Sequence, residues 1–187
     1  MTNQLASKDK AVIEKEQADK IRAVQIYREG VEDLLKLKIN KNISNGMPEH
    51  AAVLFEMFFK HASSRVRIFC QNLSAKVFNE ATVVEAAKHA LKKNVKIEII
   101  VQNDPPDQSS FLEFIKNNQA ISIRKIKIDT LKNIDVNFSV MDDRAYRFEP
   151  KRNDIAANAN MNLPEIASLL INKFEDLKVY SEPVVLV

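Results

Sequence analysis

Three short segments rich in β-branched and apolar residues constrain the fold of this chain most. Residues 65–70 (RVRIFC), 95–102 (VKIEIIVQ) and 121–128 (ISIRKIKI) each predict a β-strand. The segments between them, 73–94 and 109–118, carry apolar residues at helical spacing and predict helices. Strand–helix–strand units of this kind imply parallel strands joined by right-handed crossovers.

The second half of the chain adds antiparallel strands. Residues 135–141 and 144–149 predict a hairpin that turns at Asp142-Asp143, because aspartate favours turn positions. Residues 153–160 are a candidate for a further short strand, and Pro164 opens a last helix. We therefore expect an α/β chain of the mixed α+β kind, with a mixed sheet flanked by helices on both faces.

The N-terminal segment predicts one long amphipathic helix over residues 8–38. The chain breaks at residues 40–50, and a second helix is expected from Pro48. We therefore divide the chain into a helical extension, 1–40, and an α/β domain, 48–187. The apolar face of the extension must cover either its own domain or another chain, and periodicity alone does not choose between them. The candidate interaction residues step by 3, 4 and 3 and are Val24, Tyr27, Val31 and Leu34.

Composition narrows the classes of site. With two glycines the chain has neither of the Gly-rich phosphate-binding motifs, and its net charge of +3 permits a nucleic-acid partner without requiring one. Cys70 is the only cysteine, and its strand-like neighbours predict a buried apolar role. We expect no cofactor, no metal and no membrane span, and a cytoplasmic location. The histidines, His50, His61 and His89, show no spacing typical of a metal site or a catalytic relay.

The order of elements, together with FSVMD (138–142) and KFEDL (173–177), resembles one half of the phospholipase D superfamily over roughly residues 48–178. The superfamily motif is HxKxxxxD, followed by Gly-Ser and Asn. Aligned with it, Asp135 falls on the histidine, Asn137 on the lysine and Asp142 on the aspartate. Phe148-Glu149 takes the Gly-Ser positions, and Asn158 or Asn160 falls near the later asparagine.

This resemblance implies a lost active site. The superfamily histidine is the nucleophile and the lysine helps to hold the phosphate, whereas Asp135 is an acid and Asn137 is uncharged. Loss of the nucleophile removes most of the catalysed rate. Active members bring two motif copies together, so a single half implies a homodimer or a complex with another protein. We expect a non-catalytic binding or regulatory module. The alternatives are a divergent phosphodiesterase or nuclease that acts as a dimer, and a plain hairpin in an unrelated α/β protein.

The hairpin and the residues after it also hold the densest basic group in the chain. Its members are Arg144, Arg147, Lys151 and Arg152, and Tyr146 lies among them as in surfaces that stack single-stranded bases. We therefore weigh contact with DNA or RNA against a solvated strand end. That end would be balanced by the acidic side chains of Asp142, Asp143, Glu149 and Asp154.

Overall fold

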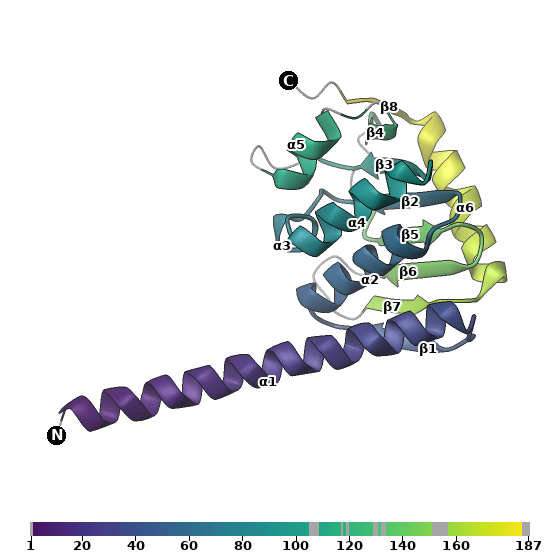
Figure 1. Ribbon diagram of the computed structural model, residues 1–187. Coiled ribbons are helices and arrows are strands. Elements are labelled where there is room, and N and C mark those ends of the chain that lie inside the picture. The colour runs from purple at the N-terminus through teal and green to yellow at the C-terminus, as the bar shows by residue number, and fades with distance from the viewer. Residues whose placement is uncertain are drawn as a thin grey trace.

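The computed structural model describes residues 2–104, 109–116, 118, 120–128, 131, 134–150 and 157–184. Within them an eight-stranded mixed sheet has the strand order β1-β7-β6-β5-β2-β3-β4-β8, with helices on both faces (Figure 1). The predicted fold class is confirmed. The strands are β1 Asn42–Asn45, β2 Arg65–Cys70, β3 Lys96–Val101, β4 Ile121–Ile126, β5 Asn137–Met141, β6 Ala145–Glu149, β7 Ala157–Asn160 and β8 Ser181–Pro183. The helices are α1 Thr2–Lys36, α2 Pro48–His61, α3 Ala75–Phe78, α4 Ala81–Lys92, α5 Ser110–Lys116 and α6 Pro164–Val179.

The strand pairing follows the predicted units. Strands β2, β3 and β4 are parallel neighbours, as strand–helix–strand connections require. Strands β5 and β6 form the predicted antiparallel hairpin, and β5 lies antiparallel beside β2. Asp142, in the turn, has a φ of 54°, a left-handed conformation that aspartate tolerates better than most residues.

Helices α2 and α4 cover one face of the sheet. Helix α2 is apolar on nearly all sides, with Leu54, Met57, Phe58 and Phe59 fully buried, because it lies between the sheet, α4 and α1. Burial of each such side chain contributes about 1.5–3 kcal/mol of transfer free energy. This layer forms the larger of two hydrophobic clusters.

Helix α6 covers the opposite face. Phe174 and Leu177 of α6 pack with Phe69, Phe138 and Tyr146 of the sheet in the second cluster. The hairpin residues therefore alternate between the two layers. Tyr146 and Phe148 pack toward α6, whereas Arg147 between them points toward the α2 layer, as the period-two pattern predicts.

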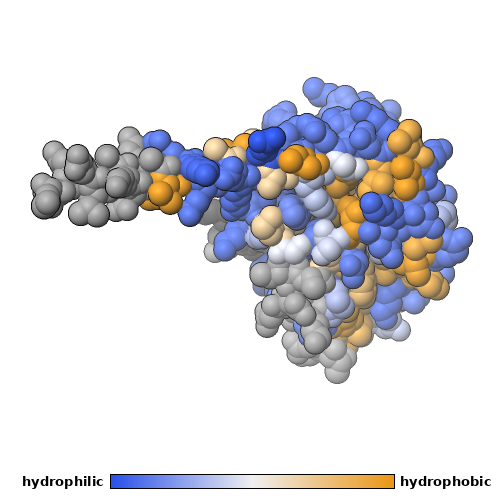
Figure 2. Space-filling model, turned by 90° about the horizontal axis from the view of Figure 1, so that it is seen from below, coloured by the Kyte–Doolittle hydropathy of each residue, from blue (hydrophilic) through white to orange (hydrophobic). Residues whose placement is uncertain are grey.

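Helix α1 rests on the chain's own domain with its C-terminal half, and its other end projects away from the body (Figures 1 and 2). Val31 is buried, and Tyr27 stacks on His50 of α2 with 3.9 Å between ring centroids. Arg28 also forms an ion pair with Glu56 of α2 at 3.1 Å. Of the two alternatives left by the sequence, the structure supports contact with the own domain for the predicted interaction residues Val24, Tyr27, Val31 and Leu34.

Two local predictions were wrong. Residues 42–45, expected within a chain break, form strand β1, which pairs antiparallel with β7 and closes one end of the sheet. The helix expected over 73–94 is two helices, because the chain turns at Asn79 and Glu80 between α3 and α4. Among the described residues, no helix is both long and apolar enough to span a membrane.

Candidate functional site

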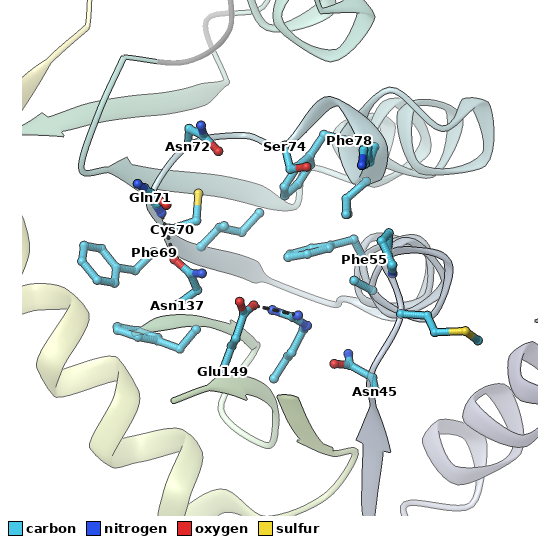
Figure 3. Close-up of a pocket in the computed structure, with 18 residues that line it drawn as sticks. Asn45, Phe55, Phe69, Cys70, Gln71, Asn72, Ser74, Phe78, Asn137 and Glu149 are labelled. Atoms are coloured by element: carbon cyan, nitrogen blue, oxygen red, sulfur yellow. Dashed lines mark hydrogen bonds and ion pairs between the residues drawn. The ribbon is translucent and has the colours of Figure 1, made fainter. Parts of the chain in front are cut away.

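A cavity of about 330 Å³ opens at the C-terminal end of parallel strand β2. In open α/β sheets, ligands commonly bind outside the carboxyl ends of strands. Four elements supply its floor. Cys70 ends β2, Asn137 begins β5 and pairs with Glu149 at the end of β6, and Asn45 ends β1 (Figure 3).

The charged floor of the cavity is an ion pair. The Arg147 guanidinium Nη2 donates to the Glu149 carboxylate Oε2 at 2.9 Å, and the two side chains are only 11% and 16% exposed. The pair comes from next-but-one residues on β6, whose side chains point to the same face. The two formal charges cancel, so the floor offers no net charge to a ligand.

Four carboxamide side chains also line the cavity: Asn45, Gln71, Asn72 and Asn137. The Asn137 Oδ1 accepts a hydrogen bond from the Gln71 backbone N–H at 2.8 Å, which ties β5 to the end of β2. Asn45 is 1% exposed, and neither polar atom of its amide forms a hydrogen bond with the described residues. The Arg147 Nε is equally unpartnered among them. An unpaired buried polar group costs about 1–3 kcal/mol.

The walls of the cavity are aromatic and aliphatic. Phe55 of α2 and Phe78 of α3 lie 4.6 Å apart between ring centroids, and Phe55 points into the cavity (Figure 3). Cys70 lies in the floor, where burial raises the pKa of its thiol to about 12. The thiol is thus protonated at neutral pH and has the apolar role that the sequence predicted for it.

The structure does not bring together the three residues aligned with the superfamily motif. Asn137 lines the cavity, Asp135 is exposed and lies outside its lining, and Asp142 lies at the far end of β5. The five residues of β5 separate Asp135 from Asp142. The two carboxylates therefore cannot share one ligand or one metal ion.

Asp142 has a structural partner instead. Its carboxylate accepts hydrogen bonds from the backbone N–H groups of Ser63, Ser64 and Arg65, and from the Ser64 hydroxyl, at 2.9–3.2 Å. Burial raises the pKa of Asp142, but these hydrogen bonds outweigh it, so the pKa lies below its ordinary value. Asp142 therefore anchors the hairpin turn to the loop between α2 and β2.

None of the three histidines lines the cavity. His50 stacks on Tyr27, and the His61 Nε2 lies 3.8 Å from the Glu32 carboxylate, so both face α1. His89 lies in α4. Burial lowers the pKa of both His50 and His61, with a nearby glutamate opposing it in each case.

Of the predicted nucleic-acid residues, the three that the structure describes do not form one surface. The Tyr146 ring packs against α6 in the second cluster and does not line the cavity, so it is not available for stacking. Arg147 lies in the cavity floor on the opposite face. The Arg144 Nη1 donates to the Met161 carbonyl oxygen at 3.0 Å. Lys151 and Arg152 lie outside the described residues.

Arg144 instead lines a second, open hollow at the opposite end of the strands, where β2 and β3 begin. It gathers cations from different elements: Arg65, Arg67, Lys93, Lys96 and Arg144. The Arg65 and Arg67 side chains are partly neutralised by Glu98, whereas Lys96 is exposed. We name these five residues the basic hollow.

Sequence reasoning missed three of the cavity amides. Asn45 was hidden in a segment whose Asn, Ser and Gly content is typical of loops, and Gln71 and Asn72 follow a strand without any recognisable motif. Their position directly after β2 was the available signal, because ligand-binding residues collect at the carboxyl ends of strands.

Solved structures of the same fold are similar to this chain at low sequence identity. No protein-family model matches the sequence, and no curated protein matches it. Nuc of Salmonella typhimurium, a phospholipase D family member, superposes with a TM-score of 0.58 at 14% identity, over 78% of this chain and 99% of Nuc. NucT of Helicobacter pylori superposes with a TM-score of 0.58 at 13% identity, again over 78% and 99% of the two chains.

A third match reaches further along this chain. TrmBL2, an archaeal chromatin protein with a novel mode of DNA binding, superposes with a TM-score of 0.56 at 12% identity. The match covers 91% of this chain and 66% of TrmBL2. Residues 37–187 alone make up a smaller share of this chain, so the match includes part of α1. The sheet order and these superpositions together show that the chain has a phospholipase D-like fold.

Proposed function

We propose that this chain is a non-catalytic binding module of phospholipase D-like fold that works within a homodimer or a protein complex and contacts nucleic acid. The observation that carries the proposal is the lining of the cavity. It holds the amide of Asn137 where the resemblance requires an ammonium, and Asp135, the acid at the position of the imidazole, lies outside it.

The chemistry of these groups opposes phosphoryl transfer. Phosphoryl transfer through a covalent intermediate needs an activated nucleophile, and neither Asn137 nor the Arg147–Glu149 ion pair supplies one. A phosphodiester anion in the cavity would meet the Glu149 carboxylate and gain no net attraction from the paired guanidinium. Asp142, the acid that the alignment retains, is engaged in holding the turn.

The projecting end of α1 supports a role in assembly. An isolated helix is marginally stable in water, and helices in proteins gain most of their stability from packing of an apolar face. Along α1 four apolar side chains are more than half exposed: Val12 and Ile13 in the projecting end, and Ile21 and Ile26 in the half beside the domain. A partner that covers them would supply the packing that the chain's own domain does not.

The basic hollow supports contact with nucleic acid. Lys93 and Lys96 lie beside the start of β3 and Arg144 follows the hairpin turn, where Asp142 and Asp143 also line the hollow. Lysine and arginine side chains are the usual contacts to phosphates. TrmBL2, of similar fold, binds DNA. The hollow replaces the predicted hairpin surface as the proposed contact, since it retains Arg144 and does not need the buried ring of Tyr146.

Binding to a fluorescent duplex and to a single strand at several salt concentrations tests the nucleic-acid contact. The affinity should fall steeply with salt, and a substitution that removes one phosphate contact should reduce the slope for duplex DNA by about 0.9. Lys96→Gln and Arg144→Gln should weaken binding, whereas Lys41→Gln, an exposed lysine outside the hollow, should not. Equal binding by all variants would remove the hollow from the proposal.

The mass of the intact assembly tests the partnership. After purification from the native source, native mass spectrometry should give a mass above that of one 21.3 kDa chain. The measurement also separates a homodimer from a complex with a foreign subunit. A single free chain at working concentrations would contradict the assembly part of the proposal.

A further inference from the structure

We infer that the cavity at the end of β2 binds a nucleobase, an uncharged planar heterocycle with hydrogen-bond donors and acceptors along one edge. The base can belong to a free nucleoside or to an unpaired position in a strand. This inference adds a second binding surface to the proposed function, at the opposite end of the strands from the basic hollow.

The size of the cavity suits a small ligand. Its volume of about 330 Å³ lies at the lower end of the range of roughly 300–1,000 Å³ for small-molecule sites. It is bounded by α2, α3, the ends of four strands and the short connection between β2 and α3, so most of its walls belong to regular elements that hold their shape. A site of this kind accommodates one heterocycle and cannot enclose a folded partner or a duplex.

The polar groups in the cavity match the edge of a base. A carboxamide presents one acceptor oxygen and one donor NH₂ group side by side, which is the pattern that Asn and Gln use to bind adenine. Asn45, Asn72 and Asn137 come from three different parts of the chain and line one cavity. The Asn137 Oδ1 is already engaged by Gln71, which fixes the orientation of that amide.

The aromatic walls match the face of a base. Phe55 points into the cavity from α2, with Phe78 beside it (Figure 3). Stacking on aromatic side chains is the usual way in which proteins hold unpaired bases, and each stacked base contributes about 1–3 kcal/mol. Phe55 and Phe78 are both buried, so the rings are fixed in position before a ligand arrives.

The electrostatics favour a neutral ligand over an anion. Glu149 neutralises Arg147 in the floor, and the remaining cation of the lining, Lys76, is exposed. The base is therefore expected in the interior, with its sugar toward Lys76 and the solvent. A free phosphate gains little from the neutral floor.

The inner end of the cavity contains donors and an acceptor in need of partners. The amide of Asn45, 1% exposed, and the Arg147 Nε have none among the described residues. In Figure 3 the Asn45 amide points from the end of β1 toward the Glu149 side of the cavity. A ligand that hydrogen-bonds to these groups removes the cost of leaving them unpaired, which strengthens binding.

Isothermal titration with adenosine, guanosine, cytidine and uridine tests the inference. At least one nucleoside should bind saturably with one site per chain, and inorganic phosphate and ribose should not compete. Val77→Trp, which fills the cavity from α3, should abolish binding, and Asn72→Ala at the exposed rim should weaken it by about tenfold. Gln17→Ala, an exposed amide on α1, should bind like the unaltered chain.

The outcomes separate this inference from the proposed function. If no nucleoside binds up to its solubility limit, or if Val77→Trp and Asn72→Ala both bind like the unaltered chain, the inference is wrong. Thermal unfolding of each variant shows whether it is folded, and the rim variant serves if Val77→Trp is not. A second titration uses a single strand and the same strand with abasic sites. Nucleoside binding without strand binding supports the cavity and contradicts nucleic-acid contact. Strand binding that is equal with and without abasic sites supports nucleic-acid contact and contradicts base binding in the cavity.

Discussion

The carboxylate of Asp142 accepts two hydrogen bonds from Ser64, one from the backbone N–H at 2.9 Å and one from the hydroxyl at 3.0 Å. The backbone N–H groups of Ser63 and Arg65 donate to the same carboxylate. These residues are separated from Asp142 by more than 75 positions in the chain, so the contact fixes the hairpin turn against the start of β2. The carboxylate acts here as a structural acceptor.

Replacement of Asp142 should therefore destabilise the fold. Asp142→Asn keeps the shape but turns one acceptor into a donor that faces N–H groups, so we expect a loss of about 2–3 kcal/mol in the free energy of unfolding. Chemical denaturation measures it. Asp143→Asn, the exposed neighbour, is the matched control and should change stability by less than about 0.5 kcal/mol. Equal stability of the two variants would show that the carboxylate is not an anchor.

The same contact predicts a pH dependence. Because the pKa of Asp142 is lowered in the folded chain, its contribution to stability is complete above the ordinary value of about 3.9 and is lost as the pH falls through the folded value. The unaltered chain should lose more stability than Asp142→Asn between pH 5 and the acid limit. Parallel acid titrations of both proteins, followed by circular dichroism, give the difference. A difference of zero would contradict the assigned hydrogen bonds.

Glu149 should stabilise the cavity floor through Arg147. Glu149→Gln leaves the guanidinium uncompensated in a mostly buried position, and we expect a loss of about 1–3 kcal/mol. The double replacement Arg147→Met with Glu149→Leu should recover part of this loss, because it removes both charges. Thermal unfolding of the unaltered chain, Arg147→Met, Glu149→Leu and the double variant measures the coupling. Additive losses in the double variant would indicate that the two side chains act independently.

The Cys70 thiol should be unreactive in the folded chain. Burial raises its pKa to about 12, so the thiolate fraction at pH 8 is very small and the sulfur is shielded as well. A maleimide reagent should label the unfolded chain in denaturant and leave the folded chain unlabelled over the same time. Rapid labelling of the folded protein would show that the cavity floor opens to solvent.

Contact between α1 and the domain should weaken at acid pH. Burial lowers the pKa of His50 in the stack with Tyr27, so the stability it confers is present above about pH 6.5 and declines as the pH falls below that value. After correction for the slower intrinsic exchange at lower pH, the protection of residues 24–35 from hydrogen exchange should fall between pH 7.5 and pH 5. His50→Phe keeps a stacking ring and should remove the part of the pH response that is due to His50. The part due to His61, near Glu32, should remain. An unchanged pH response in His50→Phe would contradict this account.

The sequence predicts the sheet better than the cavity. The segments around Val66, Ile99 and Ile123 are rich in β-branched residues and either alternate apolar and polar residues or are mostly apolar. Strands β2, β3 and β4 therefore follow from the local sequence pattern. Strand β1 does not, because NISN has a loop-like composition and becomes a strand only through pairing with β7. Tertiary pairing decides such short edge strands.

The cavity depends on contacts that no local pattern encodes. Asn45 and Glu149 are more than 100 residues apart, and only the strand order β1-β7-β6 brings them to one floor. The described members of the predicted basic surface are separated for a related reason. Alternation along β6 puts Tyr146 and Arg147 on opposite faces of the sheet, but the sequence does not show that α6 covers one of those faces and α2 the other.

Hydrolysis of bis(p-nitrophenyl) phosphate by the purified chain, with and without divalent metal ions, tests the absence of catalysis most directly. Because the cavity lining has an amide and a carboxylate and lacks an imidazole among the residues that the structure describes, we predict no release of nitrophenolate above the buffer rate at any pH from 5 to 9. The contradicting result would be turnover that co-purifies with the chain and is lost in His50→Phe or Asp142→Asn while those variants remain folded.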